Sequence, residues 1–192
     1  MKSLIENSLQ AHLEIFNNIR NDLISDIDKC AQCMINTINS GGTIYWCGNG
    51  GSASDAEHLC AELVGRFDKD RRSLSSISLT ANTSVITSIG NDFGNDEIFS
   101  RQVEGLVTKN DLLVGISTSG NSRNVERAIV KAKGIGCKTV GLLGRDGGSL
   151  GSVCDVILNV GGVDTARIQE MHILIGHILC ESIETSIVNS SI

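Results

Sequence analysis

The stretch YWCGNGGSASDAEHLCAEL, Tyr45 to Leu63, joins a short apolar run to a glycine-rich turn and then to a helical pattern. A strand, a glycine turn and a helix in this order are typical of the start of a βαβ unit. Glycines let the backbone approach an anion closely, and the free amides at a helix start can donate to it. The stretch therefore predicts a parallel α/β sheet with an anion site at GNGGS, Gly48 to Ser52.

The rest of the chain repeats this alternation. Helical stretches separate five apolar runs, which span residues 43–48, 73–79, 112–118, 139–144 and 155–160. Helical periodicity also predicts two helices before the first run, over 3–20 and 22–38, and a last helix over 165–187. We expect one domain over residues 1–192, a three-layer sandwich with a parallel sheet covered by helices on both faces and a helical extension over residues 1–40.

Composition excludes several classes of protein. The chain has 192 residues, 41% of them hydrophobic, and a net charge of −6. Since its cations are not clustered, general nucleic-acid binding is not expected. Its first twenty residues do not have the pattern of a signal peptide, and no apolar run approaches the roughly 20 residues that cross a membrane, so we expect a cytoplasmic protein without a membrane partner. Its seven scattered cysteines predict reduced thiols, and Cys30 and Cys33 fit helix packing better than a redox or metal pair.

The third apolar run ends in STSGNS, Ser117 to Ser122, before an expected helix. Four hydroxyls beside a helix start favour a phosphate cradle that uses no cation, over a simple helix cap that needs only one such side chain. Gly48, Gly50 and Ala53 also satisfy a dinucleotide-binding pattern. However, the second run ends in Thr80 and Asn82 and lacks the acid that would bind a ribose, so no nucleotide cofactor is expected.

His58 and Glu62 are four positions apart and therefore lie on one face of a helix. The spacing suits two ligands of one metal or an acid–base pair, although an ordinary ion pair would have the same spacing. On the last predicted helix, Gln169 and His177 are separated by about 12 Å of rise and about 80° of rotation. They could meet at one point only at full stretch or from different subunits, which predicts a site near a subunit interface.

Five motifs together resemble one known family. They are CGNGGSASDAEHLCAEL, GNDFGNDEIFSRQ, ISTSGNSRNV, LLGRDGGSL and TARIQEMHILIGHILCESIE. In this order they are similar to the sugar isomerase (SIS) domain family and, within it, to the phosphoheptose isomerases, also called sedoheptulose-7-phosphate isomerases. The resemblance covers nearly the whole chain. It implies a five-stranded parallel sheet, a cytoplasmic homotetramer assembled through the N-terminal helices, and an enzyme that converts sedoheptulose 7-phosphate to D-glycero-D-manno-heptose 7-phosphate for bacterial surface polysaccharides.

The resemblance also implies roles for individual residues. Glu62 and His177 match the acid–base pair, and His58, Glu62, Gln169 and His177 match the zinc ligands of members that bind zinc. His172 is left as a structural histidine. The implied substrate contacts are Asn49, Gly50, Gly51, Ser52, Glu62, Asn91, Asp92, Ser117, Thr118, Ser119, Ser122 and Gln169. The alternative is a non-catalytic SIS adaptor that binds a replication initiator protein; Glu62 and His177 favour the enzyme.

Overall fold

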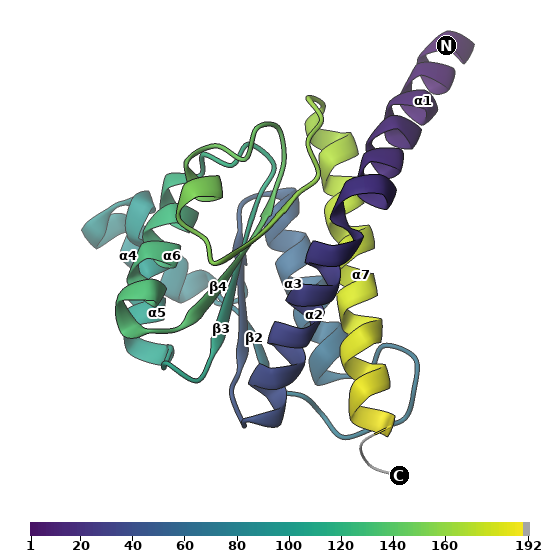
Figure 1. The fold of residues 1–192 in the computed structure, drawn as a ribbon. Helices are drawn as coiled ribbons and strands as arrows, with labels where there is room; N and C mark the ends of the chain where they lie inside the picture. Colours follow the sequence, from purple (N-terminus) through teal and green to yellow (C-terminus); the bar gives the residue numbers. More distant parts are fainter. Residues whose placement is uncertain (190–192) are drawn as a thin grey trace.

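The structure is a computed structural model that describes residues 1–189. Its centre is a five-stranded parallel sheet in the order β2-β1-β3-β4-β5 (Figure 1). The strands are β1 (Ile44–Gly48), β2 (Ser76–Ser78), β3 (Leu112–Ser117), β4 (Lys138–Leu143) and β5 (Val156–Asn159). Each strand falls within or beside one of the five apolar runs. The predicted parallel sheet is therefore confirmed.

Helices cover both faces of the sheet (Figure 1). Successive side chains of a strand point to opposite faces, so Trp46 packs in one core and its neighbours Tyr45 and Cys47 pack in the other. On the Trp46 face lie α2 (Ile24–Asn39), α3 (Gly51–Val64) and α7 (Thr165–Asn189). On the Tyr45 face lie α4 (Thr83–Phe93), α5 (Ser100–Leu106) and α6 (Arg123–Ile135). Two short helices, η2 (Asn95–Glu97) and η3 (Ser149–Ser152), lie in the connections between these elements.

The strand order places a topological switch point between β1 and β3. These strands are neighbours, but β1 leads into α3 on one face and β3 leads into α6 on the other. Ligands of open α/β sheets bind beyond the carboxyl ends of the strands at such a point. The GNGGS turn and the STSGNS loop follow β1 and β3, so both predicted anion-binding segments lie there.

The N-terminal extension is nearly one helix instead of two separate ones. A short π-helix, η1 (Ile19–Leu23), joins α1 (Lys2–Asn18) directly to α2. Such a turn inserts a local irregularity without ending the helix. Figure 1 shows that α1 continues past α7 and extends beyond the body of the domain. On α2, Cys30 is buried in the Trp46 core and Cys33 packs against that core, as helix packing predicts, and burial raises the pKa of Cys30 to about 12.

Helix α7 is a core helix of this domain. Among the described residues it is the one helix with the length and composition to cross a membrane, but half of its most apolar window is buried. Ile168, Met171, Ile175 and Leu179 pack into the Trp46 core together with residues of α2 and α3. Its apolar character therefore follows from packing against the sheet layer.

Candidate active site

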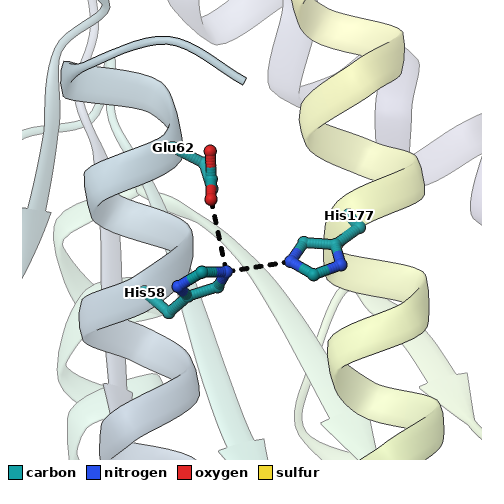
Figure 2. A group of neighbouring side chains, drawn as sticks. All are labelled: His58, Glu62 and His177. Carbon is teal, nitrogen blue, oxygen red and sulfur yellow. Dashed lines mark hydrogen bonds and ion pairs between the residues drawn. The ribbon is translucent and has the colours of Figure 1, made fainter. Parts of the chain in front are cut away.

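Helices α3 and α7 bring three predicted site residues together. The Nε2 atom of His58 lies 2.9 Å from Nε2 of His177 and 3.2 Å from Oε1 of Glu62. His58 and Glu62 are one turn apart on α3, and His177 reaches them from α7 (Figure 2). The sequence predicted this group, but only the fold shows that all three side chains meet within one protomer.

A glycine allows the two helices to approach closely at this point. A Cβ atom on Gly176 would lie 2.5 Å from the Leu59 side chain, and contacts this short do not occur. Leu59 and Gly176 are the chain neighbours of His58 and His177, respectively. The absence of a side chain at Gly176 therefore sets the helix separation at which the two imidazoles meet. Gly176 was not predicted from the sequence, because its role depends on a residue of another helix.

The three residues fit a metal ion by donor type and by spacing. One ligand atom from each of His58, Glu62 and His177 lies within 4.8 Å of the others. Histidine nitrogen and carboxylate oxygen are common zinc donors, and ligand atoms around tetrahedral zinc are about 3.3 Å apart. The two distances from His58 Nε2, 2.9 and 3.2 Å, are close to that value. The side chains would need only small movements to hold zinc.

Gln169, the fourth predicted ligand, lies nearer the start of α3. A Cβ atom on Gly51 would lie 2.3 Å from Nε2 of Gln169, so the amide rests directly on this glycine. Burial raises the pKa of Asp55, while Gln169 and His58 nearby lower it in part. Gly51 and Asp55 are seven and three positions before His58, so the Gln169 amide lies between one and two helical turns from the histidine along α3. A role of Gln169 as a zinc ligand stays a prediction.

Hydroxyl groups gather in the loop after β3. The Ser117 hydroxyl lies 2.8 Å from that of Ser122 and 3.4 Å from that of Ser119, and the Asn121 amide donates to Ser119. Ser117 is buried and Thr118, Ser119 and Ser122 are half-buried, so the cluster is only partly open to solvent. This is the arrangement expected of a cradle for a phosphate group.

The glycine turn and the hydroxyl loop are tied together by two asparagines. Each of Asn49 and Asn124 donates its amide hydrogen to the other's side-chain oxygen at 2.9 Å. Asn49, Gly50 and Gly51 are exposed, whereas Ser52 is buried in the first turn of α3. Asn124 was not predicted from the sequence, although its place two residues after Ser122 at the start of α6 points to the same loop.

Asn91 and Asp92 lie apart from the other predicted site residues. Both are exposed near the end of α4, where the Asn91 amide donates to the Asp92 carboxylate at 2.7 Å. Helix α4 packs on the Tyr45 face of the sheet, whereas His58 and His177 belong to helices on the Trp46 face. Within one protomer the sheet therefore separates these two residues from the His58 group.

The chain is similar to known proteins over nearly its whole length. The SIS domain family matches residues 9–144 of the chain. A curated relative from Aliarcobacter butzleri is 49% identical over 187 residues, which cover 97% of this chain and 99% of the relative. The chain belongs to the SIS domain family. The Aliarcobacter butzleri relative is named phosphoheptose isomerase, as is one from Nitratiruptor sp. that is 52% identical over 182 residues and covers 95% of this chain and 97% of the relative.

Solved structures of the SIS domain family show the same fold over the whole length. The phosphoheptose isomerase of Neisseria gonorrhoeae superposes with a TM-score of 0.91 at 39% identity, covering 96% of this chain and 98% of that one. The phosphoheptose isomerase of Francisella tularensis superposes with a TM-score of 0.88 at 36% identity, and the match covers 96% of each chain. The predicted family, fold and class of enzyme, a phosphosugar isomerase, are thereby confirmed.

Proposed function

We propose that this isomerase interconverts sedoheptulose 7-phosphate and D-glycero-D-manno-heptose 7-phosphate. The observation that carries the proposal is the meeting of His58, Glu62 and His177 between α3 and α7. An acid–base pair of this kind is what proton transfer next to a sugar carbonyl requires. The name that the relatives share, phosphoheptose isomerase, supports the choice of substrate.

The reaction moves a carbonyl between C2 and C1 of the open-chain sugar. A proton leaves C1 of the ketose while the C2 oxygen gains one, which gives an enediol; a proton then returns to C2 as the C1 oxygen loses its own. In this proposal Glu62 and His177 carry these protons, and each such group typically contributes about 10² to 10⁴ in rate. A zinc ion held by His58, Glu62 and His177, with Gln169 as the predicted fourth ligand, supplies polarisation of the carbonyl when bound.

The hydroxyl loop and the glycine turn would hold the phosphate and the polyol chain. Ser117, Thr118, Ser119 and Ser122 offer hydroxyls, and Asn49, Gly50 and Gly51 offer exposed groups beside them. Because the Asn49–Asn124 pair joins the two segments, they would bind one substrate as a unit. A substrate fixed at the phosphate end presents its C1 and C2 atoms to the proton-carrying groups in one orientation.

We further propose a homotetramer whose sites are shared between subunits. Asn91 and Asp92 are predicted substrate contacts, yet the sheet separates them from His58 in the same protomer. A neighbouring subunit could supply them. The exposed apolar side chains of α1, including Leu9 and Leu13, support assembly through the N-terminal helix. A cytoplasmic location and a role as the first step toward nucleotide-activated heptoses complete the proposal.

The test is turnover of sedoheptulose 7-phosphate in deuterated water, followed by NMR. We expect heptose 7-phosphate that carries deuterium at C2, because the enediol proton exchanges with solvent. Glu62→Gln and His177→Gln should each lose most of this activity, whereas Glu57→Gln should keep it, since Glu57 is an exposed acid of the same helix. A chelator should lower the rate, and added zinc should restore it.

Failure of the folded, zinc-supplemented protein to turn over this sugar would refute the proposal. Other ketose phosphates would then be tried in the same assay. The adaptor alternative would be tested by whether the protein captures a replication initiator protein. Retained activity in both Glu62→Gln and His177→Gln would instead refute the acid–base pair.

A further inference from the structure

Glu184 is a buried carboxylate two turns beyond His177 on α7. Its residue is only 1% exposed, which is rare for an acid without partners. Its oxygens accept hydrogen bonds from three consecutive backbone amides, those of Phe67 at 2.9 Å and of Asp68 and Lys69 at 2.8 Å. Burial alone would raise the pKa of Glu184, but these donors and Arg71 hold it below its ordinary value. Glu184 therefore holds the segment that follows α3 as a charged group.

Arg71 connects the same carboxylate to the end of α3. Its Nε atom lies 3.2 Å from the Glu184 oxygen, and its side chain is 2% exposed. Its terminal nitrogens donate to the carbonyls of Glu62 at 2.8 Å, Leu63 at 2.9 Å and Gly65 at 3.0 Å. The last carbonyls of a helix lack donors of their own, and a planar guanidinium can serve several at once. Arg71 thus fixes the backbone of Glu62 relative to α7.

Phe67 connects Glu184 to His177, because its backbone amide contacts the first residue and its ring contacts the second. Its backbone amide is bound by Glu184, and its ring lies 5.7 Å from the His177 ring at an angle of 48°. The half-buried His177 ring therefore contacts both Phe67 and His58. A shift of the 67–69 segment would move the aromatic contact that orients the imidazole.

We propose that Arg71 and Glu184 form a clasp that positions His177 against Glu62 and His58. Both are positioning residues, since they touch the end of α3 and the segment after it and not the reacting groups. The inference rests on the proposed roles of Glu62 and His177. It goes beyond them because it assigns the alignment of the two helices to a buried ion pair outside the site.

Glu184→Gln tests the clasp. Glutamine keeps the size of the side chain, but it loses the charge and turns an amide NH₂ group toward backbone donors. We expect kcat to fall about 10- to 100-fold at temperatures far below unfolding, with zinc affinity reduced by a similar factor, as for other supports of metal ligands. KM should change less than threefold, because the hydroxyl loop after β3 is untouched. Arg71→Lys keeps the charge but removes the planar guanidinium that donates to several carbonyls at once. It should lower kcat and zinc affinity by smaller factors.

Asp111→Asn is the matched control. Asp111 is also buried, at 7% exposure, and accepts the backbone amides of Thr43 and Thr108, each at 2.7 Å. It lies at the amino ends of β1 and β3, and the hydrogen-bond partners of its side chain, Thr43 and Thr108, belong neither to α3 or α7 nor to the 65–71 segment. We expect Asp111→Asn to lower the melting temperature as Glu184→Gln does, while kcat and zinc affinity stay unchanged.

The His177 ring provides a readout that needs no turnover. Its carbon-bound protons feel the ring current of Phe67, so their NMR signals, identified with His177→Gln, should shift in Glu184→Gln and not in Asp111→Asn. Unchanged kcat, zinc affinity and His177 signals in folded Glu184→Gln would overturn the clasp; if that variant does not fold, the same results in Arg71→Lys would overturn it. If the wild type fails to isomerise the sugar phosphate, the proposed function fails, while zinc affinity and the His177 signals still decide on the clasp.

Discussion

The Nε2 atoms of His58 and His177 lie 2.9 Å apart, although 119 positions separate the two residues in the chain. A hydrogen bond between two neutral imidazoles needs a proton on one of these atoms and a lone pair on the other. A metal ion would take the lone pairs of both, with the ring protons on the outer nitrogens. The same geometry therefore serves either a shared proton or a bound cation.

Removal of either imidazole should abolish tight zinc binding. We expect His58→Ala and His177→Ala each to weaken zinc affinity by more than the roughly 100-fold cost of losing a supporting residue. Competition with a chromophoric chelator measures this directly. His12→Ala is the control, because His12 pairs with Glu170 at 2.7 Å outside this group. Wild-type zinc affinity in both site variants would exclude a metal at this position.

Loss of a hydroxyl after β3 should affect substrate binding more than the chemical step. Hydrogen bonds to a charged group contribute about 1.5–3 kcal/mol, so Ser122→Ala should raise KM about 10- to 100-fold with kcat changed much less. Ser152→Ala removes a hydroxyl that donates only to the Ser149 carbonyl and should leave both constants unchanged. Steady-state kinetics separate the two effects. An unchanged KM in Ser122→Ala would place the phosphate elsewhere.

Two glycines inside helices should respond in opposite ways to alanine. A Cβ on Gly134 of α6 has open space around it, so Gly134→Ala should stabilise the protein by about 0.8–1 kcal/mol through helix propensity. Gly176→Ala would place a methyl group 2.5 Å from Leu59 and should cost about 1–3 kcal/mol, as overpacked sites do. It should also move His177 from His58 and weaken zinc binding. Denaturant unfolding and the chelator assay test both variants, and a stabilising Gly176→Ala would contradict the packing argument.

Much of the fold could be predicted because it depends on sequence patterns within short segments of the chain. Each of the five apolar runs became a strand of the parallel sheet, and the first and third end in the two segments at the switch point. The break expected between 20 and 22 was only a π-helical turn, since no proline or glycine is present there to end the helix. The spacing of His58 and Glu62 placed them on one face without the structure.

Other features could not be predicted because they depend on contacts between distant segments. The role of Gly176 requires Leu59, and that of Glu184 requires the amides of residues 67–69. Nothing near Glu184 in the sequence distinguishes it from a solvated acid of an amphipathic helix. The partnership of Asn124 with Asn49 likewise depends on β1 and β3 being neighbours.

His172 should make stability depend on pH. It is fully buried, and burial lowers its pKa from 6.5 to about 4, although a contact with the Leu143 backbone raises it in part. The unfolded chain therefore binds a proton between pH 6.5 and 4 that the folded chain does not, so the free energy of unfolding falls as the pH falls through this range. The shift corresponds to about 3 kcal/mol by pH 4.

Denaturant unfolding of the wild type and of His172→Leu at pH 7 and pH 4.5 checks this expectation. Leucine does not titrate, so the variant should lose less stability than the wild type on acidification. Other groups titrate equally in both proteins, and the difference between the two curves reports His172 alone. Parallel curves would show that this histidine is not the cause.

An apolar stripe on α1 should hold the subunits together. Ile5, Leu9, Leu13 and Phe16 recur every three or four positions, and their exposures are 52%, 65%, 48% and 37%. We expect Leu9→Glu combined with Leu13→Glu to convert the proposed tetramer to a smaller species in light scattering after size exclusion. Asn7→Glu adds a charge to the opposite side of the helix and should leave the tetramer intact.

Subunit mixing then tests whether neighbouring chains share one site. Glu62→Gln and Asp92→Asn should each be nearly inactive alone. If Asp92 serves the Glu62 of a neighbouring subunit, random mixing joins intact copies of both residues in about a quarter of the sites of a symmetric oligomer. Activity should therefore rise toward about 25% of wild type when the two variants are unfolded and refolded together. No recovery in mixed tetramers would mean that each site is completed within one chain, and that α4 must move to bring Asp92 to it.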